Sequence, residues 1–115
     1  MKLELKLPYP PSVNHYWRRV GSRTLISRGG RAFRKTVCSI LSARGVKPLA
    51  GPLEVEITVY PPDRRRRDID NILKSLLDAI EHGGAYHDDS QIKSLHVEKG
   101  KPAPGGKTII KIEEI

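Results

Sequence analysis

The chain has 115 residues, enough for one domain with a substantial core but not for two. Its 21 lysine and arginine residues outnumber 13 acidic residues, and the net charge of +8 favours nucleic acid over a membrane surface as partner. No apolar run approaches the ~20 residues of a membrane-spanning helix, and the first residues lack a signal-peptide pattern. The single cysteine, Cys38, excludes an intramolecular disulfide and a zinc finger, and we expect a buried thiol in a cytoplasmic protein.

The first half of the chain predicts one strand and one helix. Residues 1–7 alternate apolar and charged side chains, which is typical of a half-buried strand. Apolar side chains recur at helical spacing over residues 31–44, and the opposite face of that helix is basic. We expect Gly29-Gly30 to break the chain before this helix begins.

Between this strand and this helix lies a predicted hairpin. Residues 15–20 and 24–27 flank a Gly-Ser-Arg turn and carry several arginines. Tyr16 and Trp17 sit among those arginines. Aromatic rings beside arginines can stack on nucleic-acid bases, but a lone tryptophan in a small domain is at least as often part of the core.

The centre of the chain predicts a strand, a basic loop and a second helix. Residues 53–60 alternate apolar and polar side chains and then run into Pro61-Pro62, which ends the strand. Four consecutive arginines follow: Arg64, Arg65, Arg66 and Arg67. Apolar residues at helical spacing predict a helix with one buried face over residues 69–81.

Carboxylates and a lysine stand at the start of that second helix. Asp68 and Asp70 form a D-x-D pair beside the arginines, a combination that suits Mg²⁺ and a phosphate group. Lys74 follows Asp70 by four residues and therefore lies on the same helix face. Simpler interpretations exist for each feature. The arginines could form a solvated segment without a ligand, and Asp68 could cap the helix. Asp70 and Lys74 could form an exposed ion pair.

The last third of the chain predicts an acidic loop and two strands. Gly83-Gly84 ends the helix, and the polar loop after it contains Asp88 and Asp89, which are turn residues or a third carboxylate for the site. Residues 92–98 and 108–115 are strand-like and flank a basic loop. The order of elements indicates one α+β domain over residues 1–115, with a mixed β-sheet and both helices on one face.

Three motifs resemble the RusA family of Holliday-junction resolvases. They are Pro10-Pro11-Ser12-Val13-Asn14, the stretch from Asp63 to Asn71, and Asp88-Asp89-Ser90-Gln91. The motifs occur in the family's order and at matching separations, and the resemblance spans nearly the whole chain.

The resemblance implies a homodimer that binds a four-way DNA junction and cuts two strands. It implies Mg²⁺, with Mn²⁺ as an alternative, held by Asp68, Asp70 and Asp89, and it assigns Lys74 a catalytic or phosphate-orienting role. The DNA-binding residues would be Asn14, Arg64, Arg65, Arg66 and Arg67. The residues alone leave Asp88 open as an alternative to Asp89.

Two other functions fit the same residues. In a non-catalytic DNA-binding protein, the aspartates would cap the helix and position the arginines. In a metal-dependent nuclease for other branched DNA, the chemistry would be the same without a four-way preference. Cleavage assays with and without Mg²⁺ distinguish a non-catalytic DNA-binding protein from a resolvase. A panel of branched substrates distinguishes a general branched-DNA nuclease from a resolvase.

Overall fold

The core of the computed structural model is a mixed four-stranded sheet. The structure describes residues 2–12 and 16–115. The sheet contains β1 (Lys2–Leu7), β4 (Leu53–Tyr60), β5 (Ile92–Lys99) and β6 (Lys107–Glu114) in the order β1-β6-β4-β5. Strand β5 pairs parallel to β4, whereas β6 is antiparallel to both β1 and β4. The parallel pair is joined by a crossover that contains a helix, as parallel neighbours require.

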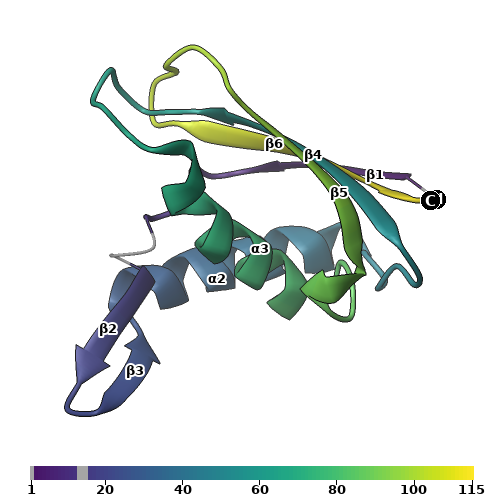
Figure 1. Ribbon diagram of the computed structural model, residues 1–115, viewed down its shortest axis with the longest axis horizontal. Coiled ribbons are helices and arrows are strands. Elements are labelled where there is room, and N and C mark those ends of the chain that lie inside the picture. Colours follow the sequence, from purple (N-terminus) through teal and green to yellow (C-terminus); the bar gives the residue numbers. More distant parts are fainter. Residues whose placement is uncertain (1, 13–15) are drawn as a thin grey trace.

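Both helices cover the same face of this sheet (Figure 1). They are α2 (Arg28–Ala43) and α3 (Leu73–His82). Alternation along β4 buries every second side chain, from Leu53 to Val59, against the helices and leaves Glu54 and Glu56 exposed. The predicted α+β fold, with a mixed sheet and two helices on one face, is confirmed. In the described residues, no helix is long and apolar enough to cross a membrane.

The predicted hairpin is also present. Strands β2 (Trp17–Val20) and β3 (Arg23–Ile26) pair antiparallel and form a separate two-stranded sheet that projects from the body of the molecule (Figure 1). Trp17 is half-buried and packs against the core.

The predicted break at Gly29-Gly30 is wrong. Both glycines lie in the first turn of α2, which begins at Arg28 and is capped by the hydroxyl of Ser27, an acceptor for the Gly30 N–H at 2.9 Å. Gly30 is needed for close packing, because a Cβ at this position would lie 2.4 Å from the carbonyl oxygen of Tyr16.

Two further expectations need correction. Cys38 is only half-buried, because the helix turns about 100° beyond Val37, whose side chain faces the core. The helix predicted from residue 69 begins as a 3₁₀ turn, η1 (Ile69–Ile72), and becomes α-helical at Leu73. Asp68 occupies the N-cap position of η1, but its side chain makes no capping hydrogen bond.

Candidate nucleic-acid and metal site

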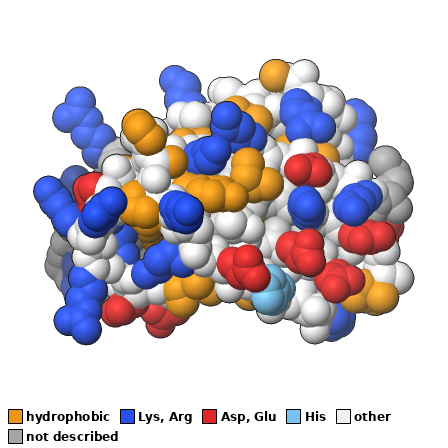
Figure 2. All heavy atoms as spheres, turned by 90° about the horizontal axis from the view of Figure 1, so that it is seen from above, with side chains coloured by type: hydrophobic (Ala, Val, Ile, Leu, Met, Phe, Trp, Pro, Cys, Tyr) orange, Lys and Arg blue, Asp and Glu red, His pale blue; other side chains and the backbone are white. Residues whose placement is uncertain are grey.

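Basic side chains gather at the end of the molecule where the loop between β4 and η1 lies (Figure 2). This arginine loop, residues 61–68, contains the four consecutive arginines. Arg64, Arg65 and Arg66 are exposed, and the side chain of Arg65 is 84% exposed. Three guanidinium groups therefore face solvent from one short loop, which is the arrangement expected of a phosphate-binding surface.

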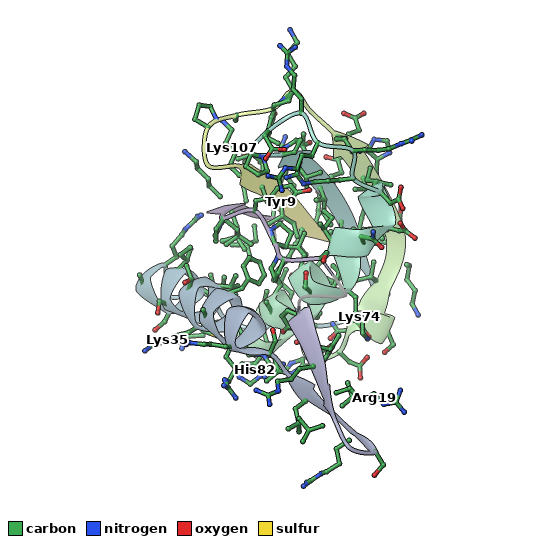
Figure 3. The ribbon with its side chains drawn as sticks, turned by 90° about the vertical axis from the view of Figure 1, so that its left-hand side faces the viewer. Tyr9, Arg19, Lys35, Lys74, His82 and Lys107 are labelled. Atoms are coloured by element: carbon green, nitrogen blue, oxygen red, sulfur yellow. The ribbon has the colours of Figure 1, made fainter. Side chains whose placement is uncertain are left out.

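Lys74 lies on the first turn of α3 and is exposed (Figure 3). No ion pair joins it to Asp70 in the part of the chain that the structure describes. The simpler interpretation of these two residues as a surface ion pair therefore has no support in the geometry. The Lys74 ammonium group interacts electrostatically with Asp78, one turn further along α3, and is exposed to solvent.

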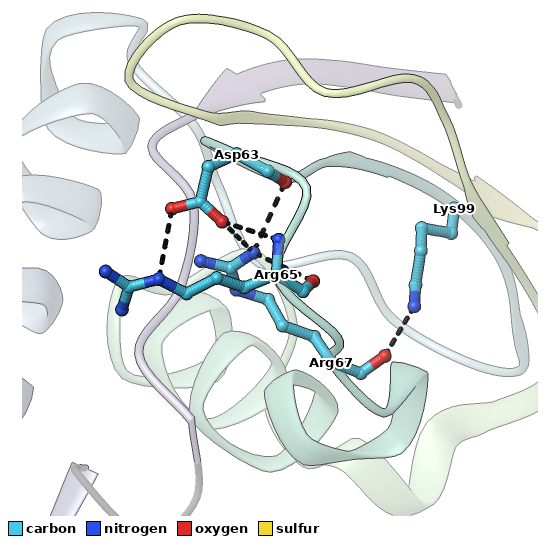
Figure 4. Close-up of polar contacts among 4 residues, drawn as sticks. All are labelled: Asp63, Arg65, Arg67 and Lys99. Carbon is cyan, nitrogen blue, oxygen red and sulfur yellow. Dashed lines mark hydrogen bonds and ion pairs between the residues drawn. The ribbon is translucent and has the colours of Figure 1, made fainter.

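Asp63 organises the arginine loop (Figure 4). Its Oδ1 accepts hydrogen bonds from the guanidinium of Arg67 at 2.7 Å and from the backbone N–H of Arg65 at 2.9 Å. These bonds lower the pKa of Asp63 to about 2, and the hydrogen bond from Arg67 has the largest effect. Sequence reasoning did not assign Asp63 a role. Aspartate side chains nevertheless often close a turn by accepting a hydrogen bond from the backbone two residues further on, and this pattern could have indicated the role of Asp63.

Arg67 differs from its three neighbours. Its side chain is 23% exposed and lies over the ring of Tyr9, 5.8 Å from the centroid. The amino group of Lys99 donates to its carbonyl oxygen. Arg67 therefore holds the loop to the protein body. The other three arginines project from the loop, and Arg65 also forms a longer ion pair with Asp63, at 3.8 Å.

Two clefts flank the arginine loop. One, of about 520 Å³, is lined by Tyr9, Ser12, Asp68 and Asn71 together with three of the arginines. The other, of about 760 Å³, lies between the loop and the segment that follows β5. The Ser75 hydroxyl donates to the carbonyl of Pro11 at 2.6 Å, which ties the proline segment to α3. Asn14 lies outside the described residues.

The structure brings Asp89 together with two other carboxylates. Oxygen atoms of Glu81, Asp88 and Asp89 lie within 4.8 Å of one another, and the backbone N–H of Asp89 donates to Glu81 at 2.6 Å. In the described part of the chain, this is the one such group of three or more potential metal-ligating side chains. Asp68 and Asp70 are exposed and lie outside it. Sequence reasoning did not anticipate Glu81.

The acidic loop is held by its own hydrogen bonds. Asp89 begins the 3₁₀ turn η2 (Asp89–Gln91), which Asp88 caps by accepting from the Ser90 N–H at 2.8 Å. This backbone bond is the main reason that the pKa of Asp88 is lowered. The amide of Gln91 donates to the carbonyls of Leu49 and Gly51, both at 3.0 Å. The acidic loop is thus fixed against the protein body, and Asp88 remains ionised at neutral pH.

Comparison with known proteins identifies the class of this fold and site. The family model of endodeoxyribonuclease RusA matches residues 8–113. The crossover junction endodeoxyribonuclease RusA of Enterobacteria phage HK97 is 44% identical over 110 residues, covering 95% of this chain and 92% of that protein. The proteins of the same name from Enterobacteria phage 82 and Escherichia coli K12 are each 38% identical over 112 residues, covering 96% of this chain and 93% of each relative.

Such matches along almost the entire length define the chain as an endodeoxyribonuclease. It belongs to the RusA family. The family predicted from the three motifs is therefore confirmed.

Proposed function

We propose that this protein is a crossover junction endodeoxyribonuclease that binds four-way DNA junctions and resolves them by paired phosphodiester hydrolysis, in DNA recombination and repair. The observation that carries the proposal is the family match over residues 8–113. The geometry supports it, because exposed arginines and a lysine lie beside exposed carboxylates on adjoining elements.

The proposed metal ligands are Asp68, Asp70 and Asp89, with Mg²⁺ as the ion and Mn²⁺ as an alternative. The chemistry of the side chains fits, because hard divalent cations prefer carboxylate oxygens and all three side chains are exposed. In the structure Asp68 and Asp70 lie outside the carboxylate group that contains Asp89, so a shared ion would have to draw the three side chains together. Glu81 and Asp88 supply further carboxylate oxygens beside Asp89. A bound ion would lower the pKa of a water molecule and stabilise the negative charge that develops on the phosphate.

The chain's own cations would bind and orient the DNA. Arg64, Arg65 and Arg66 would bind phosphates that flank the cut, since they project from a loop that Asp63 and Arg67 hold in place. The ammonium of Lys74 would orient or neutralise the scissile phosphate from the adjoining helix. Asn14 is proposed as a further DNA-binding residue on the resemblance of its motif alone.

We also propose that the protein acts as a homodimer. A four-way junction offers two symmetric strands to cut, and a two-fold dimer carries two acidic sites in matching symmetry. A single chain of 12.9 kDa has little surface with which to span a junction.

Cleavage of a labelled immobile junction, with and without Mg²⁺, tests this function. We expect binding in both conditions and cleavage only with the metal. Binding without cleavage in Mg²⁺ or Mn²⁺ would indicate a non-catalytic DNA-binding protein. Equal cleavage of flaps, forks and four-way junctions would indicate a nuclease for branched DNA in general.

A further inference from the structure

The positive charge of this protein is concentrated away from the arginine loop. No aspartate or glutamate occurs between Glu4 and Glu54, and this segment contains ten lysines and arginines. The rest of the chain contains eleven basic and thirteen acidic side chains. The net charge of +8 therefore comes entirely from the segment between Glu4 and Glu54, and seven of its ten basic side chains lie on the hairpin and α2.

The hairpin displays arginines on both of its faces. Strand pairing places Trp17 opposite Ile26, and both side chains pack against the core. Because side chains alternate along a strand, Arg18 and Arg23 lie on the face turned away from the core, with Arg19 on the other. All three arginines are exposed. The outward face also exposes Val20 and Leu25, each 42% accessible, and no acidic side chain neutralises the hairpin from within.

A buried side chain fixes the root of the hairpin. Tyr16 is fully buried, and its hydroxyl donates to the carboxylate of Asp78 on α3. Arg34 on α2 also donates to Asp78, at 2.7 Å. The Tyr16 carbonyl accepts from the Ser27 N–H at 2.8 Å, so both ends of the hairpin are joined at the base. The hairpin therefore keeps a defined orientation relative to both helices.

The same anchor relates the hairpin to the proposed catalytic lysine. Asp78 follows Lys74 by about one turn of α3. Figure 3 shows Arg19 and Lys74 on the same side of the molecule and Lys35 on the opposite side. DNA that meets Lys74 and continues toward the hairpin would therefore reach Arg19 on the same side of the protein.

We propose that the β2–β3 hairpin is a second DNA-binding element, which binds the sugar–phosphate backbone of a duplex arm beyond the cut site. Arginines on both faces suit the two phosphate strands that border one groove, and a two-stranded ribbon is narrow enough to lie in the major groove. The inference rests on the proposed function, because it takes a junction arm as the ligand.

Paired charge variants test the hairpin. The hairpin variant carries Arg18→Gln, Arg19→Gln and Arg23→Gln, and the control variant carries Lys2→Gln, Lys35→Gln and Lys47→Gln. All six side chains are exposed, and both variants lose the same charge. Binding to an immobile junction is measured without divalent metal over a range of salt concentrations, and circular dichroism verifies that each variant is folded.

We expect the hairpin variant to bind at least about tenfold more weakly, with the slope of log K against log salt reduced by about 0.9 for each phosphate that the variant no longer binds. The control variant should retain most of its affinity and its slope. Equal weakening in both variants would mean that only net charge matters and would overturn the proposal. A normal salt slope in the hairpin variant would overturn it too, as would impaired self-association with unchanged DNA binding, which would assign the hairpin to a protein interface.

Arm length provides a second readout. The longest dimension of the molecule is 38 Å, which about 11 base pairs span at 3.4 Å each. When the arms are shortened below that length, wild-type affinity should fall toward that of the hairpin variant, and the difference between the two should vanish. A difference independent of arm length would contradict binding beyond the cut site. Because cleavage is not measured, failure here is distinct from failure of the proposed enzymatic function.

Discussion

At the residue scale, a substitution at Asp70 distinguishes most clearly between an effect on DNA cleavage and an effect on DNA binding. The side chain is exposed and makes no ion pair with Lys74 in the described part of the chain, so its charge contributes little to folding. We predict that Asp70→Asn abolishes junction cleavage while binding persists or tightens, because the substitution removes a proposed metal ligand and a repulsive charge together. Gel-based cleavage and binding assays measure the two effects. Nicking at the wild-type rate would exclude Asp70 as a ligand, and an unfolded circular-dichroism spectrum would show that its role is structural.

Tyr16 gives a residue-scale prediction about stability. Burial, followed by the hydrogen bond to Asp78, raises the pKa of Tyr16 from 10.0 to about 12. Because the folded-state pKa is the higher one, the stabilisation is complete below pH 10 and disappears as the pH rises toward 12.

We predict that Tyr16→Phe lowers the free energy of unfolding by about 1–3 kcal/mol at pH 8, since Asp78 loses a hydrogen-bond donor. The difference between wild type and variant should shrink between pH 10 and pH 12 in urea unfolding experiments. A difference that stays constant over that range would contradict the assigned titration.

Residue spacing predicted part of the site. The arginines and Asp88-Asp89 were identified because they are local features of the sequence. Glu81 was missed because only the packing of α3 against the η2 turn brings its carboxylate to Asp89, eight residues further on. The Tyr16–Asp78 hydrogen bond joins residues 62 positions apart and leaves no local pattern.

At the scale of elements, the arginine loop should act as a backbone-binding surface. We predict that replacing Arg65 and Arg66 with alanine weakens DNA binding across sequences and reduces the salt slope by about 0.9 for each phosphate released from the loop. Arg67 stays in place in this variant, so the hydrogen bond that orders the loop is kept. Fluorescence anisotropy on several duplex and junction sequences measures the effect, and alanine at Lys2 and Lys47 provides the charge-matched control. An unchanged slope would show that the loop does not bind the backbone.

Elements with strong periodicity were predicted well, whereas their pairing was not. Strand β4 coincides with the predicted residues 53–60 because its alternation is unbroken. The parallel pairing of β5 with β4 depends on the crossover through α3, which periodicity does not encode. The break predicted at Gly29-Gly30 was wrong because the glycine at position 30 allows close packing of the helix against Tyr16 and does not interrupt the helix.

At the scale of the whole molecule, the proposed paired cleavage would require two chains, each carrying one catalytic site. We predict that light scattering at micromolar concentrations gives twice the 12.9 kDa mass of the chain. The sequence does not reveal which apolar surface would form the interface. A strand at an exposed sheet edge and a strand with a solvated face show the same alternation of apolar and polar residues. A monomer mass, together with single nicks that never become paired cuts, would overturn the dimer and leave a simpler nuclease.

The pairing of the two cuts is the most direct test of a junction-resolving function. A supercoiled plasmid with an extruded cruciform presents one four-way junction, which paired cuts convert to linear DNA and a single cut converts to a nicked circle. We predict linear product in Mg²⁺, no cleavage after chelation, and no cleavage of the same plasmid relaxed so that the cruciform is absorbed. Accumulation of nicked circles without linear product, or equal cleavage of the relaxed plasmid, would contradict paired resolution of a four-way junction.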